Sequence, residues 1–141
     1  MASIFSKIIA GEIPCHKVAE SSNYFAFLDI RPVSKGHTLV VPKNEVDYVF
    51  DLDNHTYLGL MEFAKKVAKA MDQVLKPIRV GMTVEGLEVP HAHVHLIPMY
   101  AEGGPFRLGR SIELKSDEMR HIAEHIACLL YTSDAADDLV G

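Results

Sequence analysis

The stretch Val89-Pro90-His91-Ala92-His93-Val94-His95-Leu96-Ile97-Pro98 decides how the rest of the chain is interpreted. Successive side chains of a β-strand point to opposite faces of its sheet, so an extended chain here would place His91, His93 and His95 on one face. The small and apolar residues between and after them would then face a hydrophobic core. The pattern therefore predicts a strand over residues 89–99 that carries a row of three imidazoles, about 7 Å apart.

Three imidazoles in a row are more typical of chemistry than of packing. Each neutral ring has one donor and one acceptor, and both need partners when the ring is buried. Three adjacent imidazolium charges would repel one another, so at least one ring should stay neutral near pH 7. A neutral imidazole can act as a nucleophile, and a charged neighbour can stabilise phosphate oxygens, which suits attack at phosphorus. A zinc site and a solvated histidine-rich strand are the alternatives.

Length and composition favour a single domain with its own hydrophobic core. The chain has 141 residues, of which 48% are hydrophobic, and a formal net charge of -5. The negative charge disfavours a broad nucleic-acid surface, and no run approaches the about 20 apolar residues of a membrane span. The N-terminus lacks the features of a signal peptide, and two cysteines predict no disulfide framework. We therefore expect a cytoplasmic protein that binds neither nucleic acid nor membrane.

Apolar periodicity and turn residues predict three helices and five strands. The longest helix is expected at residues 54–75, where Asp53 is among the candidate N-caps and Pro77 ends the helix. Ser3 would cap a short first helix, and Gly11 would end it. Hairpin-like spacing of the strands favours an antiparallel sheet and the α+β class. The strands are expected at residues 16–20, 24–28, 38–41, 78–84 and 89–99, and a last helix from residue 117 onward.

The His-x-His-x-His motif, followed by Leu96-Ile97, resembles the signature of the histidine-triad (HIT) superfamily. The resemblance spans about residues 3–127 and implies a HIT-like α+β fold, with a five-stranded antiparallel sheet, one long helix and short N- and C-terminal helices. It also implies a homodimer and a purine nucleotide substrate, with no cofactor. Further blocks are similar, in the family's order, to those of the Hint-like branch: residues 4–9 (IFSKII), 12–14 (EIP), 27–30 (FLDI), Pro32 and 36–43 (GHTLVVPK).

The resemblance assigns catalytic roles to four histidines. His93 falls on the family's nucleophile, which attacks the α-phosphorus of a nucleotide. His95 would contact the α-phosphate, and His91 would orient His93 through its backbone carbonyl. His37 falls on a fourth histidine that packs beside the triad. Taken alone, His37 is more typical of a hydrogen-bonded loop histidine, but the neighbouring triad favours the catalytic interpretation.

The resemblance also assigns residues that bind the nucleotide. Asp29 matches a carboxylate that accepts hydrogen bonds from the ribose hydroxyls, although an aspartate before Arg31-Pro32 also suits a turn. Binding of a substrate amine by Glu88 is a hypothesis. Apolar residues of the slot that would hold the base equally suit a hydrophobic core. This slot would be formed by Phe5, Ile8, Phe27, Ile30 and Leu39.

Two departures from the Hint-like pattern bear on the chemistry. The family has Asn and Gln ahead of the triad, whereas this chain has Thr83 or Val84, and then Leu87, which puts the leaving-group preference in doubt. Many bacterial relatives hold a structural zinc with a Cys-x-x-Cys near the N-terminus. Here the matching residues are Ser3-Ile4-Phe5-Ser6, and Glu45 stands where a later histidine ligand would lie. We therefore predict that the chain has no structural zinc, and we assign no metal-binding residues.

Residues 128–138 resemble a translated transposon-end adapter of the kind used to prepare sequencing libraries, and an ordinary polar tail is the alternative. We therefore predict a HIT domain at residues 1–127 and a non-native, adapter-derived tail at residues 128–141. No functional residue is expected in the second of these segments.

Together these features predict a HIT-type nucleotide hydrolase or transferase. It would cleave at the α-phosphorus of purine nucleoside phosphoramidates, or related nucleotides, through a nucleotidyl-histidine intermediate. No metal is required, because imidazolium and backbone N–H groups can hold the phosphate charge. Three alternatives stay open: a nucleotide-binding regulatory module with little turnover, a hydrolase of dinucleotide polyphosphates, and a metal-dependent hydrolase that uses the triad as ligands.

Overall fold

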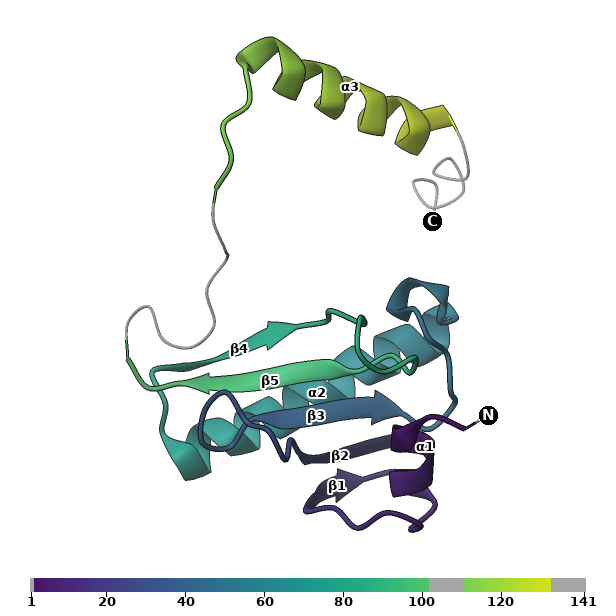
Figure 1. Ribbon diagram of the computed structural model, residues 1–141, viewed down its shortest axis with the longest axis vertical. Coiled ribbons are helices and arrows are strands. Elements are labelled where there is room, and N and C mark those ends of the chain that lie inside the picture. The colour runs from purple at the N-terminus through teal and green to yellow at the C-terminus, as the bar shows by residue number, and fades with distance from the viewer. Residues whose placement is uncertain (1, 102–110, 133–141) are drawn as a thin grey trace. The chain divides into compact units, whose positions relative to one another are not determined.

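The computed structural model describes residues 2–101 and 111–132, which belong to two units of the chain. The second unit holds α3 (Ser116–Thr132). All other elements belong to the first unit (Figure 1). They are α1 (Ile4–Ile9), β1 (Lys17–Glu20), β2 (Tyr24–Leu28), β3 (Thr38–Pro42), the short 3-10 helix η1 (Val49–Asp51), α2 (Asn54–Leu75), β4 (Arg79–Thr83) and β5 (Val94–Met99).

The five strands of the first unit form one sheet in the order β1-β2-β3-β5-β4. Every neighbouring pair is antiparallel, which confirms the predicted α+β class and the five-stranded antiparallel sheet. The helix α2 connects β3 to β4, and β5 then inserts between these two strands. As a result, β3 and β5 lie side by side at the centre, with Leu39 opposite His95 and Val40 opposite Val94.

Capping residues set the helix boundaries close to the predicted ones. The Ser3 hydroxyl accepts a hydrogen bond of 3.0 Å from the Ser6 N–H at the start of α1. Gly11 follows this helix with φ +84°, a conformation that favours glycine. The Asp53 carboxylate accepts a hydrogen bond of 2.7 Å from the Thr56 N–H, so α2 begins at Asn54 as expected.

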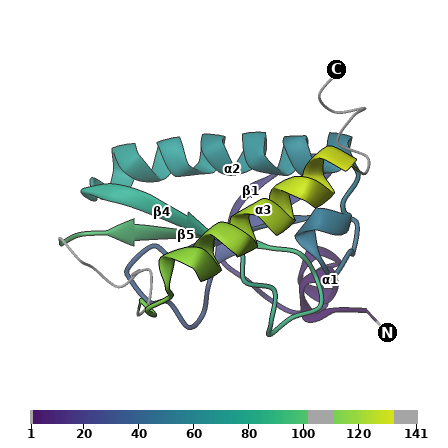
Figure 2. The ribbon, with the colours of Figure 1, turned by 90° about the horizontal axis from the view of Figure 1, so that it is seen from above.

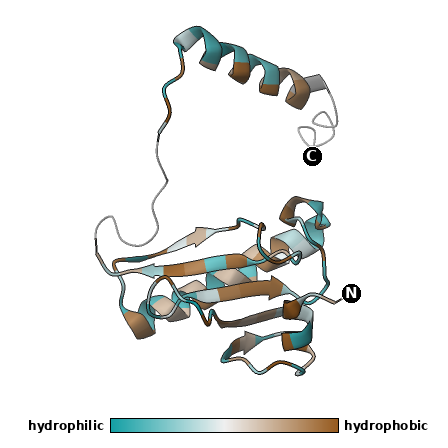
Figure 3. Cartoon of the chain, in the orientation of Figure 1, coloured by the Kyte–Doolittle hydropathy of each residue, from teal (hydrophilic) through white to brown (hydrophobic). Residues whose placement is uncertain are grey.

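Hydrophobic side chains cover the sheet on two faces. α2 packs on one face, whereas α1 lies on the other (Figures 1 and 2). Ala92, Val94 and Leu96 belong to the α2 core, which confirms their predicted orientation. The core on the α1 face consists of Phe5, Phe25, Phe27, Leu39 and Val41. Because both faces are covered, β3 is buried along its whole length. Its residues are accordingly largely hydrophobic (Figure 3).

The strand that carries the histidine motif begins later than predicted. β5 starts at Val94, so only His95 of the three histidines lies within it. The His91 N–H bonds to the Val89 carbonyl at 2.7 Å, which closes a tight turn around Pro90. The predicted strand over residues 89–93 is therefore wrong, because this segment uses its backbone groups in a turn and in loop contacts.

Several predictions from the sequence are not tested by the described residues. α3 runs across the boundary predicted after residue 127, and residues 133–141 lie outside the described residues, so the adapter-derived tail stays a prediction. No helix among the described residues is long and apolar enough to span a membrane. The cytoplasmic location and the homodimer likewise stay predictions.

Candidate active site

Three of the four histidines meet at one cavity on the face of the sheet opposite α2. His95 projects from β5, His93 lies just before this strand, and His37 lies just before β3. The ring centroids of His93 and His95 are 4.8 Å apart, and those of His37 and His95 are 5.2 Å apart. The cavity has a volume of about 290 Å³ and is also lined by Asp29 and Glu88. The structure thus brings together these predicted site residues.

His91 lies behind this cavity and does not line it. Its side chain is fully buried, and its Nε2 lies 2.8 Å from the Pro42 carbonyl oxygen. A carbonyl only accepts, so Nε2 carries a hydrogen, and burial lowers the pKa of His91, which favours the neutral ring. Nδ1 of His91 is then an acceptor, and the Ser3 hydroxyl donates to it at 2.7 Å. Both ring nitrogens of His91 are therefore occupied.

The backbone of His91 fixes the ring of His93. Nδ1 of His93 lies 2.7 Å from the His91 carbonyl oxygen, so Nδ1 carries a hydrogen and donates it. In a neutral ring, Nε2 of His93 then holds a free lone pair. Among the described residues no buried side-chain nitrogen or oxygen lacks a hydrogen-bond partner, and this Nε2 has none, so it is accessible from the cavity. The geometry presents an oriented nucleophile.

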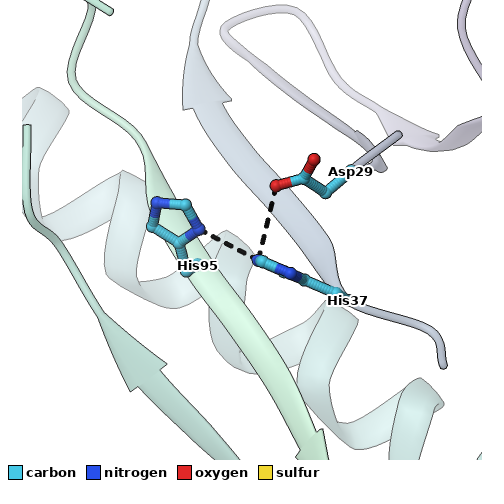
Figure 4. Close-up of side chains that lie close together, drawn as sticks. All are labelled: Asp29, His37 and His95. Carbon is cyan, nitrogen blue, oxygen red and sulfur yellow. Dashed lines mark hydrogen bonds and ion pairs between the residues drawn. The ribbon is translucent and has the colours of Figure 1, made fainter. Parts of the chain in front are cut away.

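The same reasoning fixes the hydrogens of His37 and His95. The Val33 N–H donates to Nδ1 of His37 at 3.2 Å, so in the neutral ring Nε2 of His37 carries the hydrogen. This Nε2 donates to Nδ1 of His95 at 2.9 Å, as the dashed line in Figure 4 shows. Burial lowers the pKa of both rings. Neutral His95 is thereby left with an accessible Nε2–H, a hydrogen-bond donor beside the lone pair of His93.

Asp29 follows β2 and faces His37. Its Oδ1 accepts a hydrogen bond of 2.8 Å from the Arg31 N–H, which is the turn contact considered from the sequence. Its Oδ2 lies 3.6 Å from Nε2 of His37 (Figure 4). The two interpretations of this residue are therefore compatible, because one oxygen closes the turn and the other faces the histidines.

The residues of the predicted apolar slot surround one small cavity. Its volume is about 120 Å³, and Asp29 lines both this cavity and the histidine cavity. Phe5 also contacts His93, with ring centroids 4.9 Å apart. The core interpretation holds for part of the set, because Phe5, Phe27 and Leu39 are buried, whereas Ile30 is 81% exposed. All five predicted residues line the cavity: Phe5, Ile8, Phe27, Ile30 and Leu39.

The same arrangement bears on metal binding. Asp29, His37 and His95 offer three ligand atoms within 4.8 Å of one another. To bind a metal through Nε2, His37 would have to move its hydrogen from Nε2 to Nδ1. Two donors would then face each other, because the Val33 N–H points at Nδ1. The triad itself does not supply three ligands, because both ring nitrogens of His91 are already hydrogen-bonded. The donor set thus disfavours the metal-dependent hydrolase.

Comparison with known proteins agrees with this fold and this motif. The family model described as HIT domain matches residues 10–102. The chain belongs to the HIT family. It is 35% identical to Protein hit of Bacillus subtilis, over 92% of this chain and 95% of that protein. It is 34% identical to the adenosine 5'-monophosphoramidase of Schizosaccharomyces pombe, over 90% of this chain and 97% of that protein.

Solved structures show the same similarity. A crystal structure of a HIT family member from Bacillus subtilis has a TM-score of 0.80 to this chain at 34% sequence identity. The match covers 90% of this chain and 96% of that chain. The HIT-like fold expected from the resemblance is therefore confirmed.

Sequence reasoning missed some groups at the HIT site. Arg31 is the one Lys or Arg side chain among the described residues that line the histidine cavity, where Glu85 and Glu88 are acidic. Its position two residues after Asp29 could have indicated it, because a phosphate site needs positive charge. The Val33 N–H and the Pro42 carbonyl could not have been indicated, since backbone groups carry no sequence signature.

The buried histidines predict a pH-dependent stability. Burial lowers the pKa of His91 from its usual value of about 6.5. Just below this pH, the ring is therefore protonated in the unfolded chain and still neutral in the folded chain. The contribution of His91 to the free energy of unfolding should therefore be complete above about pH 6.5 and should decrease as the pH falls below this value. His91→Asn should flatten this slope in urea denaturation, whereas His16→Asn, at an exposed residue, should not. An unchanged slope in His91→Asn would contradict the assignment.

Proposed function

We propose that this HIT protein hydrolyses purine nucleoside phosphoramidates, or related nucleotides, at the α-phosphorus through a nucleotidyl-His93 intermediate. The observation that carries the proposal is the accessible Nε2 of His93, held by the 2.7 Å bond from its Nδ1–H to the His91 carbonyl. The adjacent Nε2–H of His95 supports it. The similarity to adenosine 5'-monophosphoramidases supports the choice of a nucleoside phosphoramidate.

The first step is displacement at phosphorus. The lone pair on Nε2 of His93 forms a bond to the α-phosphorus as the bond to the leaving nitrogen breaks, and the amine departs with a proton taken from solvent. His95 donates from Nε2–H to a phosphate oxygen, where negative charge is concentrated. Because Nδ1 of His93 keeps its hydrogen, the nucleotidylated ring becomes a cation that still donates to the His91 carbonyl.

The second step is hydrolysis of this intermediate. A water oxygen attacks the phosphorus, the bond between phosphorus and Nε2 of His93 breaks, and the proton lost by the water passes to solvent. The products are a nucleoside monophosphate and the original neutral ring. Splitting one displacement into two lowers each barrier, because a good leaving group is formed in between.

The two adjoining cavities indicate the orientation in which a nucleotide would bind. The base would enter the apolar cavity beside Phe5, and the α-phosphate would lie against His93 and His95. Asp29 lines both cavities, so its Oδ2 lies where the ribose hydroxyls of such a nucleotide would be. Arg31 supplies a positive charge on the phosphate side.

The covalent intermediate is the first test. Wild-type protein mixed with adenosine 5'-phosphoramidate and quenched within a single turnover should gain the mass of one adenylyl group, as measured by intact-protein mass spectrometry. His93→Gly should gain none, because among the described residues no other accessible imidazole lone pair is oriented at this cavity. Calorimetric titration of His93→Gly with AMP is the control for an intact nucleotide site.

The outcomes separate the rival functions. Binding of AMP by the wild type without an adduct would favour the regulatory module and contradict the proposed hydrolase. Hydrolysis without an adduct, abolished by a chelator and restored by zinc, would favour the metal-dependent hydrolase. A faster reaction with diadenosine polyphosphates than with phosphoramidates would favour the dinucleotide substrate class.

The second test concerns the ribose. Asp29→Asn should raise KM for adenosine 5'-phosphoramidate by about tenfold, because hydrogen bonds to a charged group are lost. It should also reduce the preference for the ribonucleotide over the 2'-deoxyribonucleotide in steady-state kinetics. Asp47→Asn removes an exposed carboxylate that does not line the histidine cavity and should leave both quantities unchanged. An unaltered sugar preference in Asp29→Asn would contradict this role.

A further inference from the structure

A hydrogen-bonded cluster lies behind the histidine cavity and joins three distant segments. Oε1 of Glu45, in the loop after β3, accepts from the Ser3 N–H at 2.7 Å and from the Ser6 hydroxyl at 2.6 Å. The Ser3 hydroxyl in turn donates to Nδ1 of His91 at 2.7 Å. The start of α1, the loop after β3 and the histidine motif are therefore held together by side chains that also cap a helix.

These residues stand where the resemblance implies a structural zinc in many bacterial relatives. They do not fit that metal, because zinc prefers thiolate and imidazole ligands, whereas Ser3 and Ser6 offer neutral hydroxyls. The nearby ring of His91 has no free nitrogen for a metal either, since its Nδ1 accepts from the Ser3 hydroxyl and its Nε2–H donates to the Pro42 carbonyl. Among the described residues no buried side-chain nitrogen or oxygen lacks a hydrogen-bond partner, so the buried atoms of the cluster are satisfied without an ion.

We propose that Ser3, Ser6 and Glu45 replace the metal and act as positioning residues for His93. They act through His91, whose carbonyl oxygen holds the Nδ1–H of His93. The catalytic consequence rests on the proposed function, whereas the geometric consequence does not. None of the three residues lines the histidine cavity, so their effect on the reaction is indirect.

The His91 carbonyl has little freedom to move. The ring of His91 is held on one side by Ser3 and on the other by Pro42, and the following Ala92 N–H bonds to the Val46 carbonyl at 2.7 Å. Removal of the Ser3 hydroxyl leaves Nδ1 of a fully buried ring without its donor. The ring then shifts to find another partner, and the attached carbonyl shifts with it.

This shift would change which ring nitrogen of His93 carries the hydrogen. Its Nδ1–H is fixed by one acceptor, the His91 carbonyl. When that bond weakens, the other neutral form gains population, with the hydrogen on Nε2 and no lone pair at the reactive atom. The cluster therefore keeps His93 in its nucleophilic form.

The role of Glu45 is geometric. Its pKa is lowered, first by the bond from the Ser3 N–H and then by the Ser6 hydroxyl, so it is ionised near neutral pH. The amide oxygen of a glutamine can accept the same two hydrogen bonds. Glu45→Gln should therefore retain the function of the cluster, whereas Glu45→Ala should lose it.

The experiment uses the full chain and separates positioning from helix capping. Ser3→Gly removes the hydroxyl but keeps most of the capping, because glycine is a tolerated N-cap. Ser3→Thr restores a hydroxyl, and Asp53→Ala is the matched control, since it removes the N-cap of α2 and Asp53 does not line the histidine cavity. For each variant, 15N NMR of the histidine rings gives the tautomer of His93, and quenched-flow mass spectrometry gives the rate of adduct formation.

The expected result is specific to the cluster. Ser3→Gly and Glu45→Ala should populate the Nε2–H form of His93 and slow adduct formation about tenfold, with KM unchanged. Ser3→Thr and Glu45→Gln should resemble the wild type. Asp53→Ala should lower the unfolding temperature without altering the tautomer or the rate.

Two results would overturn the proposal. One is an unchanged tautomer of His93 in Ser3→Gly and Glu45→Ala, and the other is stoichiometric zinc in protein dialysed against a chelator. Failure of the proposed function looks different, because wild-type protein would then form no adduct while the NMR comparison still decides whether the cluster positions His93.

Discussion

The hydrogen bond from Nδ1 of His93 to the His91 carbonyl, 2.7 Å long, determines what the site can do. It leaves the lone pair of His93 on the ring nitrogen that reaches the cavity. Similar backbone contacts set two of the other rings, since the Pro42 carbonyl orients His91 and the Val33 N–H orients His37, and His37 in turn donates to His95. Backbone groups do not titrate in this range and cannot rotate freely. The pattern of hydrogens on four imidazoles is therefore a consequence of the fold.

The two faces of the central strands carry separate tasks. In β5, Val94 and Leu96 point into the core beneath α2, while His95 between them points to the site. In β3, Val40 faces α2, while Leu39 faces α1 and lines the apolar cavity. A shift of one residue in the pairing of these strands would exchange the two sets. The core thus also fixes the register that assembles the site.

The sequence predicted the parts of this arrangement that depend on periodicity. Helical spacing and caps predicted α2 with the bounds that the structure shows, and alternation predicted that Ala92, Val94 and Leu96 face the core. The strand prediction was wrong for residues 89–93, because the turn at Pro90 takes the backbone out of the sheet, although Ala92 still faces the core.

The links between distant segments could not be predicted from the sequence. Ser3 was assigned as a helix cap, which it is, but its contact with His91 spans 88 positions along the chain and has no local signature. The apolar slot allowed two interpretations, and both hold, since Phe5 is a buried core residue that also lines a cavity and contacts His93. The family resemblance was needed to associate Asp29 and His37 with the triad.

The neutral rings of His37 and His95 favour the proposed reaction at His93. When Nε2 of His93 bonds to phosphorus while Nδ1 keeps its hydrogen, the ring becomes cationic, and its bond to the His91 carbonyl becomes charge-assisted and stronger. This gain arises only as the reaction proceeds, so it lowers the barrier without tightening substrate binding. Burial lowers the pKa of His37 and His95, and an imidazolium at either would repel the developing cation. The sequence motif suggested a charged partner for the phosphate, but the buried geometry favours a neutral donor, which holds the oxygen without opposing the cation on His93.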